Sequence, residues 1–369
     1  MRNHTFSIAK GIAIIAMVAG HAEAPELVTN FIYTWHMPFF FIAAGYFFSP
    51  AYADNPYPFI EKRFKGLYLP FLKWSLFFLV THNIWHHFGI LNETYGNWTG
   101  GVTHPYGWRD ALQRLVMIFT SMSGYDEFMA GAFWFFRGLL VASVLFLIFY
   151  RLLTRNLHVS PSAALAIICA GAVAFTALRI CWNLKIPGYP NGGWRETWGI
   201  FFFAMGVAYK RYESRIPENI WLFLLYFALL CGAAVMHLSG MNNGGRLRDL
   251  WSLPLTGALG LLALHWLAGT IQKRSPGIIR NTLIFIGDNT LYVFIFHILA
   301  FKTVSLAKIL WYGLEFEQIG CHMVIHHNHT DFFWVVYTIA GTALPLLCLQ
   351  AIRRIRNARQ SRQLSPSGT

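Results

Sequence analysis

The sequence predicts an all-α polytopic membrane protein whose transmembrane helices, about ten in number, form one bundle. Of its 369 residues, 56% are hydrophobic and only 12% are charged, a composition too apolar for a soluble domain of this size. The apolar residues also fall in runs of about 20, the length at which a helix crosses about 30 Å of hydrocarbon. Composition and run length together therefore indicate repeated membrane crossings.

Ten apolar runs follow one another along the chain, separated by segments that contain Pro, Gly or charged residues. They cover residues 6–22, 31–49, 66–86, 130–153, 161–182, 195–212, 217–239, 249–270, 283–311 and 331–352. We expect the membrane domain to occupy residues 1–355 and a basic, disordered cytoplasmic tail to occupy residues 356–369. The stretch 109–119 has apolar residues at helical spacing and is expected to lie along the membrane surface.

The first run has features of a secretory signal peptide. Arg2 and Lys10 lie at its start, and a small-residue motif that begins at Ala22 follows it. Pro25, directly after that motif, and His21, inside the apolar stretch, argue against cleavage. We therefore expect the run to be retained as the first membrane helix.

The net charge of +13 is unevenly distributed along the chain. Most Lys and Arg residues lie in segments that would share one side of the membrane with the N-terminus, such as Lys62, Arg63 and Lys65. Because loops on the other side hold few cations, the positive-inside rule places both termini in the cytoplasm. The charge therefore indicates the orientation of a multi-pass protein of the cell membrane, and no nucleic-acid partner is expected.

The first run carries two ionisable residues on one side of its helix. Lys10 and His21 are eleven residues apart, a spacing that returns to nearly the same face about 16 Å along the axis. Ionisable side chains at this depth usually face a cavity or another part of the protein. His36 lies near the start of the second run, so a hairpin of the two helices would bring it close to His21.

Three stretches carry a resemblance to a known family. They are Lys10 and His21 with ten residues between them, then HMPFFFIAAGYFF and KRFKGLYLP, and FIGDNTLYVFIFH near the C-terminus. The chain resembles the acyltransferase 3 family of integral membrane O-acyltransferases, most closely its fucose-O-acetylase-like branch. It differs from the family in having Lys10 in place of Arg and Ala44-Gly45 in place of Ser-Gly.

The resemblance implies transfer of an acyl group, acetyl in this branch, from cytoplasmic acyl-CoA to a hydroxyl of a cell-envelope or lipid-linked sugar. His21 would be the general base, because an alcohol is almost wholly protonated at neutral pH and the pKa of histidine suits proton transfer. A transient acyl-histidine is the alternative role. Lys10 and His36 would assist His21 in catalysis, and His297 resembles a position in the family's C-terminal helix that we assign to substrate binding.

The basic segment after the second run is the candidate donor site. Lys62, Arg63 and Lys65 suit the phosphates of acyl-CoA, although such a cluster equally suits lipid head groups. Lys10 and Arg137, a cation inside the fourth run, are added to this donor-binding set.

The end of the loop that leads into the sixth run is the candidate acceptor site. Arg195 and Glu196 lie there between Trp194 and Trp198. Sugars bind to aromatic ring faces and to hydrogen-bonding polar groups, so Arg195 and Glu196 are predicted to contact the acceptor.

Three other functions use similar residues. A secondary transporter would place buried charged residues in such a bundle, with Asp288 as a candidate coupling residue. A membrane haem protein would use a pair such as His21 and His297. Histidine pairs one helical turn apart also suggest metal ligands, but no clear carboxylate ligand accompanies them and we expect no metal; these pairs are His82 with His86 and His322 with His326.

Overall fold

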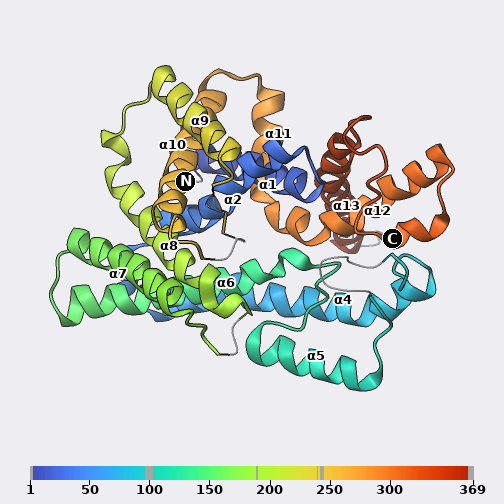
Figure 1. Cartoon of the computed structure of the whole chain (residues 1–369), viewed down its shortest axis with the longest axis horizontal. Coiled ribbons are helices and arrows are strands. Elements are labelled where there is room, and N and C mark those ends of the chain that lie inside the picture. Colours follow the sequence, from blue (N-terminus) through green and yellow to red (C-terminus); the bar gives the residue numbers. More distant parts are fainter. Residues whose placement is uncertain (1–2, 96–102, 188–189, 239, 242–244, 365–369) are drawn as a thin grey trace.

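The computed structural model describes residues 3–95, 103–187, 190–238, 240–241 and 245–364, and the regular elements in these ranges are all helices (Figure 1). Six helical segments of this part of the chain are long and apolar enough to cross a membrane. They are α2 (Glu26–Tyr46), Gly131–Asn156 with α6 (Trp134–Arg151) inside it, α7 (Pro161–Trp182), α10 (Asp249–Arg274), α12 (Thr290–Tyr312) and α13 (Phe333–Leu364). The protein is therefore an all-helical polytopic membrane protein, as its composition predicts.

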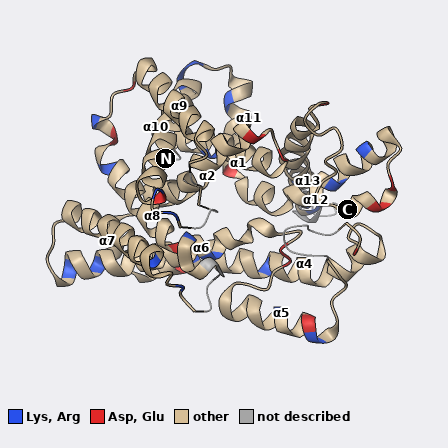
Figure 2. Cartoon of the chain, in the orientation of Figure 1, with Lys and Arg blue, Asp and Glu red and all other residues tan. Residues whose placement is uncertain are grey.

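The remaining apolar runs form helices that are shorter or more polar. These are α1 (His4–His21), α4 (Leu69–His87), α8 (Trp194–Tyr212) and α9 (Ile220–Val235). The connection before α4 forms α3 (Tyr57–Arg63) and a π-helical turn, η2 (Phe64–Tyr68). The predicted surface helix is α5 (Trp108–Ser121), which packs on α4 at the edge of the molecule (Figure 1). Figure 2 shows that charged residues lie mainly at helix ends and in connections.

Two segments differ from the prediction by more than a shift of a helix end. The run expected to be one helix over 283–311 is divided at Asn289 into α11 (Gly277–Asp288) and α12. Asn289 has φ −122° and ψ 23°, and its side-chain amide donates to the carbonyl of Phe285 at 2.8 Å. At the C-terminus, α13 continues through residue 364, into the segment expected to be disordered, because its Arg, Gln and Ala residues favour helix. Residues 365–369 lie outside the described ranges.

Capping residues explain where several helices begin and end. The side chain of Asn3 accepts a hydrogen bond from the Phe6 amide at the start of α1, and Ser160 does the same for Ala163 at the start of α7. Helix α12 ends where Gly313 takes a left-handed conformation at φ 63°, which costs glycine little.

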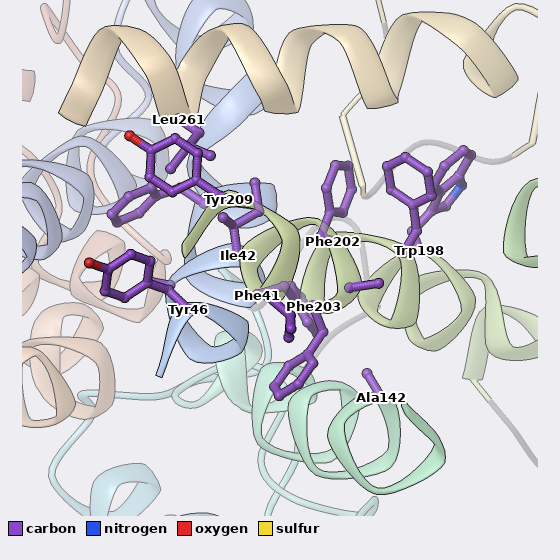
Figure 3. Close-up of a cluster of buried hydrophobic side chains, with 14 of the residues drawn as sticks. Phe41, Ile42, Tyr46, Ala142, Trp198, Phe202, Phe203, Tyr209 and Leu261 are labelled. Carbon is purple, nitrogen blue, oxygen red and sulfur yellow. The ribbon is translucent and has the colours of Figure 1, made fainter. Parts of the chain in front are cut away.

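Close backbone contact holds the bundle together where α2 meets α8. A Cβ atom on Gly45 would collide with the carbonyl of Phe203, and one on Gly206 would collide with the carbonyl of Ile42. The two glycines therefore allow the helices to touch, as small residues do in membrane bundles. Figure 3 shows Phe41, Ile42 and Phe203 in the apolar cluster at this contact.

Helix α1 occupies the middle of the bundle. It packs against α2, α10, α11, α12 and α13, and Gly287 of α11 leaves no room for a Cβ against the carbonyl of Ser7. The hydroxyl of Ser7 donates to Oδ1 of Asp288 at 2.7 Å. These contacts fix the rotation of α1 and hence the direction in which His21, its last residue, points.

Candidate functional site

A cavity of about 190 Å³ lies between α1, α2, α6, α12 and the π-helical turn η2. His21 and His36 line it, and Gly66 and Leu67 of η2 line it as well. The rest of its wall is mainly apolar: Ile14, Met17, Met37, Phe40, Ala132, Trp134, Phe135, Phe136, Thr290, Leu291 and Phe294. Two imidazoles and the part of η2 that directly follows Lys65 therefore face the same cavity.

His21 is hydrogen-bonded to His297 of α12. The distance from Nδ1 of His21 to Nε2 of His297 is 2.9 Å. Nδ1 of His297 lies 3.1 Å from the carbonyl oxygen of Val293 and 3.0 Å from that of Phe294. Because carbonyl oxygens only accept, Nδ1 of His297 carries the hydrogen.

This arrangement sets the protonation pattern of the whole pair. With its hydrogen on Nδ1, neutral His297 has a lone pair on Nε2, so Nδ1 of His21 is the donor in the bond between them. Nε2 of His21 is then left with a lone pair. A metal bound between the two facing nitrogens would need two bonds of about 2 Å each, and the 2.9 Å hydrogen bond leaves no space for it. The two facing nitrogens of this pair therefore bond to each other and not to a haem iron in this structure.

His36 is held in a similar way on the neighbouring helix. It is buried, and its Nδ1 donates to the carbonyl oxygen of Ile32 at 2.8 Å. Its ring packs beside that of Tyr33, with centroids 5.2 Å apart. Nε2 of His36 therefore also keeps a lone pair, and the structure brings His21, His36 and His297 together.

The predicted donor-binding cations fall into different environments. The Arg63 guanidinium packs over the rings of Phe59 and Phe203, at 4.8 Å and 5.4 Å from their centroids, and burial lowers its pKa to about 10. Lys62 and Lys65 are exposed, and Lys65 pairs with Glu61 one turn away. Arg63 thus has an internal contact, whereas Lys62 and Lys65 face outward.

Lys10 lies on α1, eleven residues before His21, and is half-buried. Lys10 is not among the described residues that line the cavity. The structure therefore places it on the same helix as His21 and nearer the predicted inner end, and it does not place it beside the imidazoles.

Arg137, predicted to bind the donor, is paired with a predicted acceptor residue. Its Nε lies 3.1 Å from Oε1 of Glu196, and both side chains are 5% exposed. Arg195 stacks over Trp134, with its Cζ 4.1 Å from the ring centroid, and Trp134 lines the cavity. Arg137, assigned to the donor, thus lies in the same region as Arg195 and Glu196, assigned to the acceptor, at the junction of α6 and α8.

The connection between α12 and α13 lies close to the central histidines, which was not expected from the sequence. There the ring of His322 lies 6.2 Å from that of Phe301, and Phe301 lies 5.7 Å from His297. The sequence held a signal, because Lys302 and Lys308 interrupt an apolar run. The structure shows that both are buried. A buried lysine needs partners, and here the partners are carbonyls of this connection.

The comparisons with known proteins identify the family. No curated protein and no solved structure matches the chain. A family model described as an acyltransferase domain matches residues 3–354, nearly the whole length. It does not distinguish a branch, and it favours an enzyme over the transporter considered above. The chain therefore belongs to the acyltransferase 3 family and is a multi-pass membrane acyltransferase.

Proposed function

We propose that the protein transfers an acetyl group from cytoplasmic acetyl-CoA to a hydroxyl of a cell-envelope or lipid-linked sugar, with His21 as the general base. The observation that carries this proposal is the hydrogen bond from His21 to His297, which leaves Nε2 of His21 with a lone pair on a residue that lines the cavity. A base oriented by a second group is the arrangement that activates hydroxyl nucleophiles.

The transfer balances with this one base. Nε2 of His21 takes the proton of the acceptor hydroxyl as its oxygen attacks the thioester carbonyl. The new C–O bond forms, the C–S bond breaks, and the proton passes from His21 to the leaving thiolate of CoA. His297 stabilises the imidazolium that exists between these events, because its Nε2 accepts the Nδ1 hydrogen of His21.

The cavity supports entry of the donor from the predicted inner face. Gly66 lines it one residue after Lys65, and a Cβ placed on Gly66 would meet no atom within 4 Å. Lys62 and Lys65 would bind the CoA phosphates outside the cavity, with Lys10 contributing charge on α1. The acyl group would then extend to His21, so that the acyl group crosses the membrane while CoA stays in the cytoplasm.

The size of the cavity and the resemblance to the fucose-O-acetylase-like branch both support a short acyl group. A wall formed by Met17, Met37 and Phe40 encloses about 190 Å³. We therefore propose acetyl-CoA as the co-substrate and O-acetylation of an envelope polysaccharide or its lipid-linked precursor as the biological reaction.

Release of CoA from acetyl-CoA by protein in proteoliposomes tests the proposal. Wild type is expected to release CoA faster in the presence of envelope glycan. His21→Ala is expected to release CoA at least about 10²-fold more slowly than wild type under the same conditions. His158→Ala is the matched control, because His158 is exposed and distant from α1 in sequence. Normal CoA release by His21→Ala would disprove the mechanism.

A further inference from the structure

Two buried lysines of α12 fix the backbone on both sides of His322. Nζ of Lys302 donates to the carbonyls of Ile319 at 2.7 Å and Cys321 at 2.6 Å. Nζ of Lys308 donates to the carbonyl of Val324 at 2.6 Å. A buried ammonium is costly unless its N–H groups have hydrogen-bond acceptors. Here the acceptors are backbone carbonyls of the connection between α12 and α13. The position of His322 is therefore set by the helix core.

The ring of His322 lies between two aromatic rings beside the histidine pair. Its centroid is 5.9 Å from that of Phe128 and 6.2 Å from that of Phe301, and Phe301 in turn contacts His297. Within the described residues no hydrogen-bond partner occupies its ring nitrogens, and the side chain is half-buried. The ring is thus held in place while its polar atoms remain available to a ligand.

The electrostatic surroundings keep this ring neutral. Burial, together with the positive charges that His21 and Lys302 would carry, lowers the pKa of His322 to about 3. A neutral imidazole has one N–H donor and one lone pair. That combination suits a hydroxyl group, which also donates and accepts.

Asn328 supplies a second available polar atom in the same connection. The residue is 4% exposed, and its amide nitrogen donates to the carbonyls of Ala22 and Glu23, at 3.0 Å and 3.1 Å, directly after His21. Its Oδ1 is buried and has no hydrogen-bond partner among the described residues. A buried acceptor without a partner is uncommon in proteins and calls for a ligand or water.

We propose that His322 and Oδ1 of Asn328 form a subsite for the sugar acceptor, which binds hydroxyls next to the one that reacts. The inference rests on the proposed function. Asn328 bonds to the two carbonyls that directly follow His21, and Phe301 lies against both His297 and His322. The connection therefore adjoins the base, and the neighbouring hydroxyls of a sugar that reacts at His21 would lie beside it. His322 is then an acceptor-binding residue that does not act on the thioester.

The test separates donor from acceptor kinetics. Membranes of cells that lack the protein serve as acceptor, and incorporation of labelled acetate is measured while the amount of membrane or of acetyl-CoA is varied. His322→Ala is expected to raise the half-saturating amount of acceptor about tenfold, as for loss of one or two hydrogen bonds. The KM for acetyl-CoA and the acceptor-independent release of CoA are expected to stay within about twofold of wild type.

Two further variants make the test specific. His322→Gln keeps a donor and an acceptor and is expected to fall between wild type and His322→Ala. His326→Ala removes an exposed imidazole four residues later in the same connection and is expected to behave as wild type.

The proposal is overturned if His322→Ala and His326→Ala have the same acceptor dependence. It is also overturned if His322→Ala loses acceptor-independent CoA release as His21→Ala does, because His322 would then serve the base. Wild type that neither releases CoA nor incorporates acetate would instead refute the proposed function. The thermal midpoint of each purified variant in detergent shows that it is folded.

Discussion

Nε2 of His297, in α12, accepts a hydrogen bond from Nδ1 of His21, the last residue of α1, over a distance of 2.9 Å. The two residues are 276 positions apart, so the bond depends on how α1 packs among α11, α12 and α13. Because the N–H of His297 is directed to the carbonyls of its own helix, the orientation of His21 follows from helix packing and is present before a substrate binds.

The first prediction concerns this orientation. His297→Ala removes the acceptor for Nδ1 of His21 and is expected to lower kcat by about 10- to 100-fold, part of the about 10²–10⁴-fold contribution of a general base. His297→Gln offers a carbonyl oxygen in place of the lone pair and should retain more activity than His297→Ala. Steady-state CoA release measures both, with His158→Ala as control. Equal kcat in wild type and His297→Ala would mean that His297 only packs.

Sequence patterns predicted the helices and the three central histidines, because both depend on local information. Apolar run length predicts a membrane helix wherever the run occurs, and His21, His36 and His297 lie within stretches that resemble the family. The break at Asn289 was not predictable in this way, because apolar residues continue on both sides of it. Its backbone is stabilised by a tertiary contact, since Arg353 of α13 donates to its side-chain oxygen at 2.9 Å.

Contacts between distant helices were the part that the sequence could not provide. Arg137 and Glu196 were assigned to different substrates, and their pairing depends on the rotation of α6 and α8 about their axes. His322 was considered only with His326, because a spacing of four suggests a helix, whereas the segment is an irregular connection held by Lys302.

The second prediction concerns Lys10. Lys10→Ala is expected to raise the KM for acetyl-CoA, because a cation on the donor side of α1 is lost, whereas Lys10→Arg keeps the charge and adds donors. Lys273→Ala, which removes an exposed lysine paired with Glu218, serves as control. If Lys10→Ala has a normal KM and Lys10→Arg is inactive, the residue contributes to packing and its place in the motif has no role in donor binding.

The third prediction concerns the buried pair of Arg137 and Glu196. Glu196→Gln leaves the guanidinium without its paired charge and is expected to destabilise the folded protein by about 3–5 kcal/mol, as breaking a buried ion pair does. Changing both residues, Arg137→Met with Glu196→Leu, should restore part of the lost stability. The thermal midpoint of the protein in detergent measures the effect.

The control for this pair is Glu218→Gln, which breaks an exposed pair with Lys273 and should have little effect on the midpoint. An unchanged midpoint in Glu196→Gln, together with a raised half-saturating amount of acceptor, would instead support the acceptor role that the sequence suggested for Glu196.

The fourth prediction concerns the contact between α2 and α8. Gly45→Ala forces a Cβ against the carbonyl of Phe203 and is expected to cost about 1–3 kcal/mol, the usual cost of overpacking. Gly232→Ala in α9 is the matched control, because its added Cβ meets no atom within 4 Å and alanine favours helix. Equal thermal midpoints for the two variants would show that the helices separate without cost.

The last prediction decides on which side of the membrane each part of the reaction takes place. After replacement of the native cysteines, single cysteines are placed by Ala51→Cys, between α2 and α3, and by Lys185→Cys, between α7 and α8. Both positions are exposed. An impermeant thiol reagent applied to intact cells should label the cysteine at 185 and leave the one at 51 unlabelled until the cells are opened, because the cation distribution places Lys62 and Lys65 inside. The reverse pattern would put His21 at the cytoplasmic end of α1, where acetyl-CoA and the base are on one side, and transfer of the acyl group across the membrane would lose its physical basis.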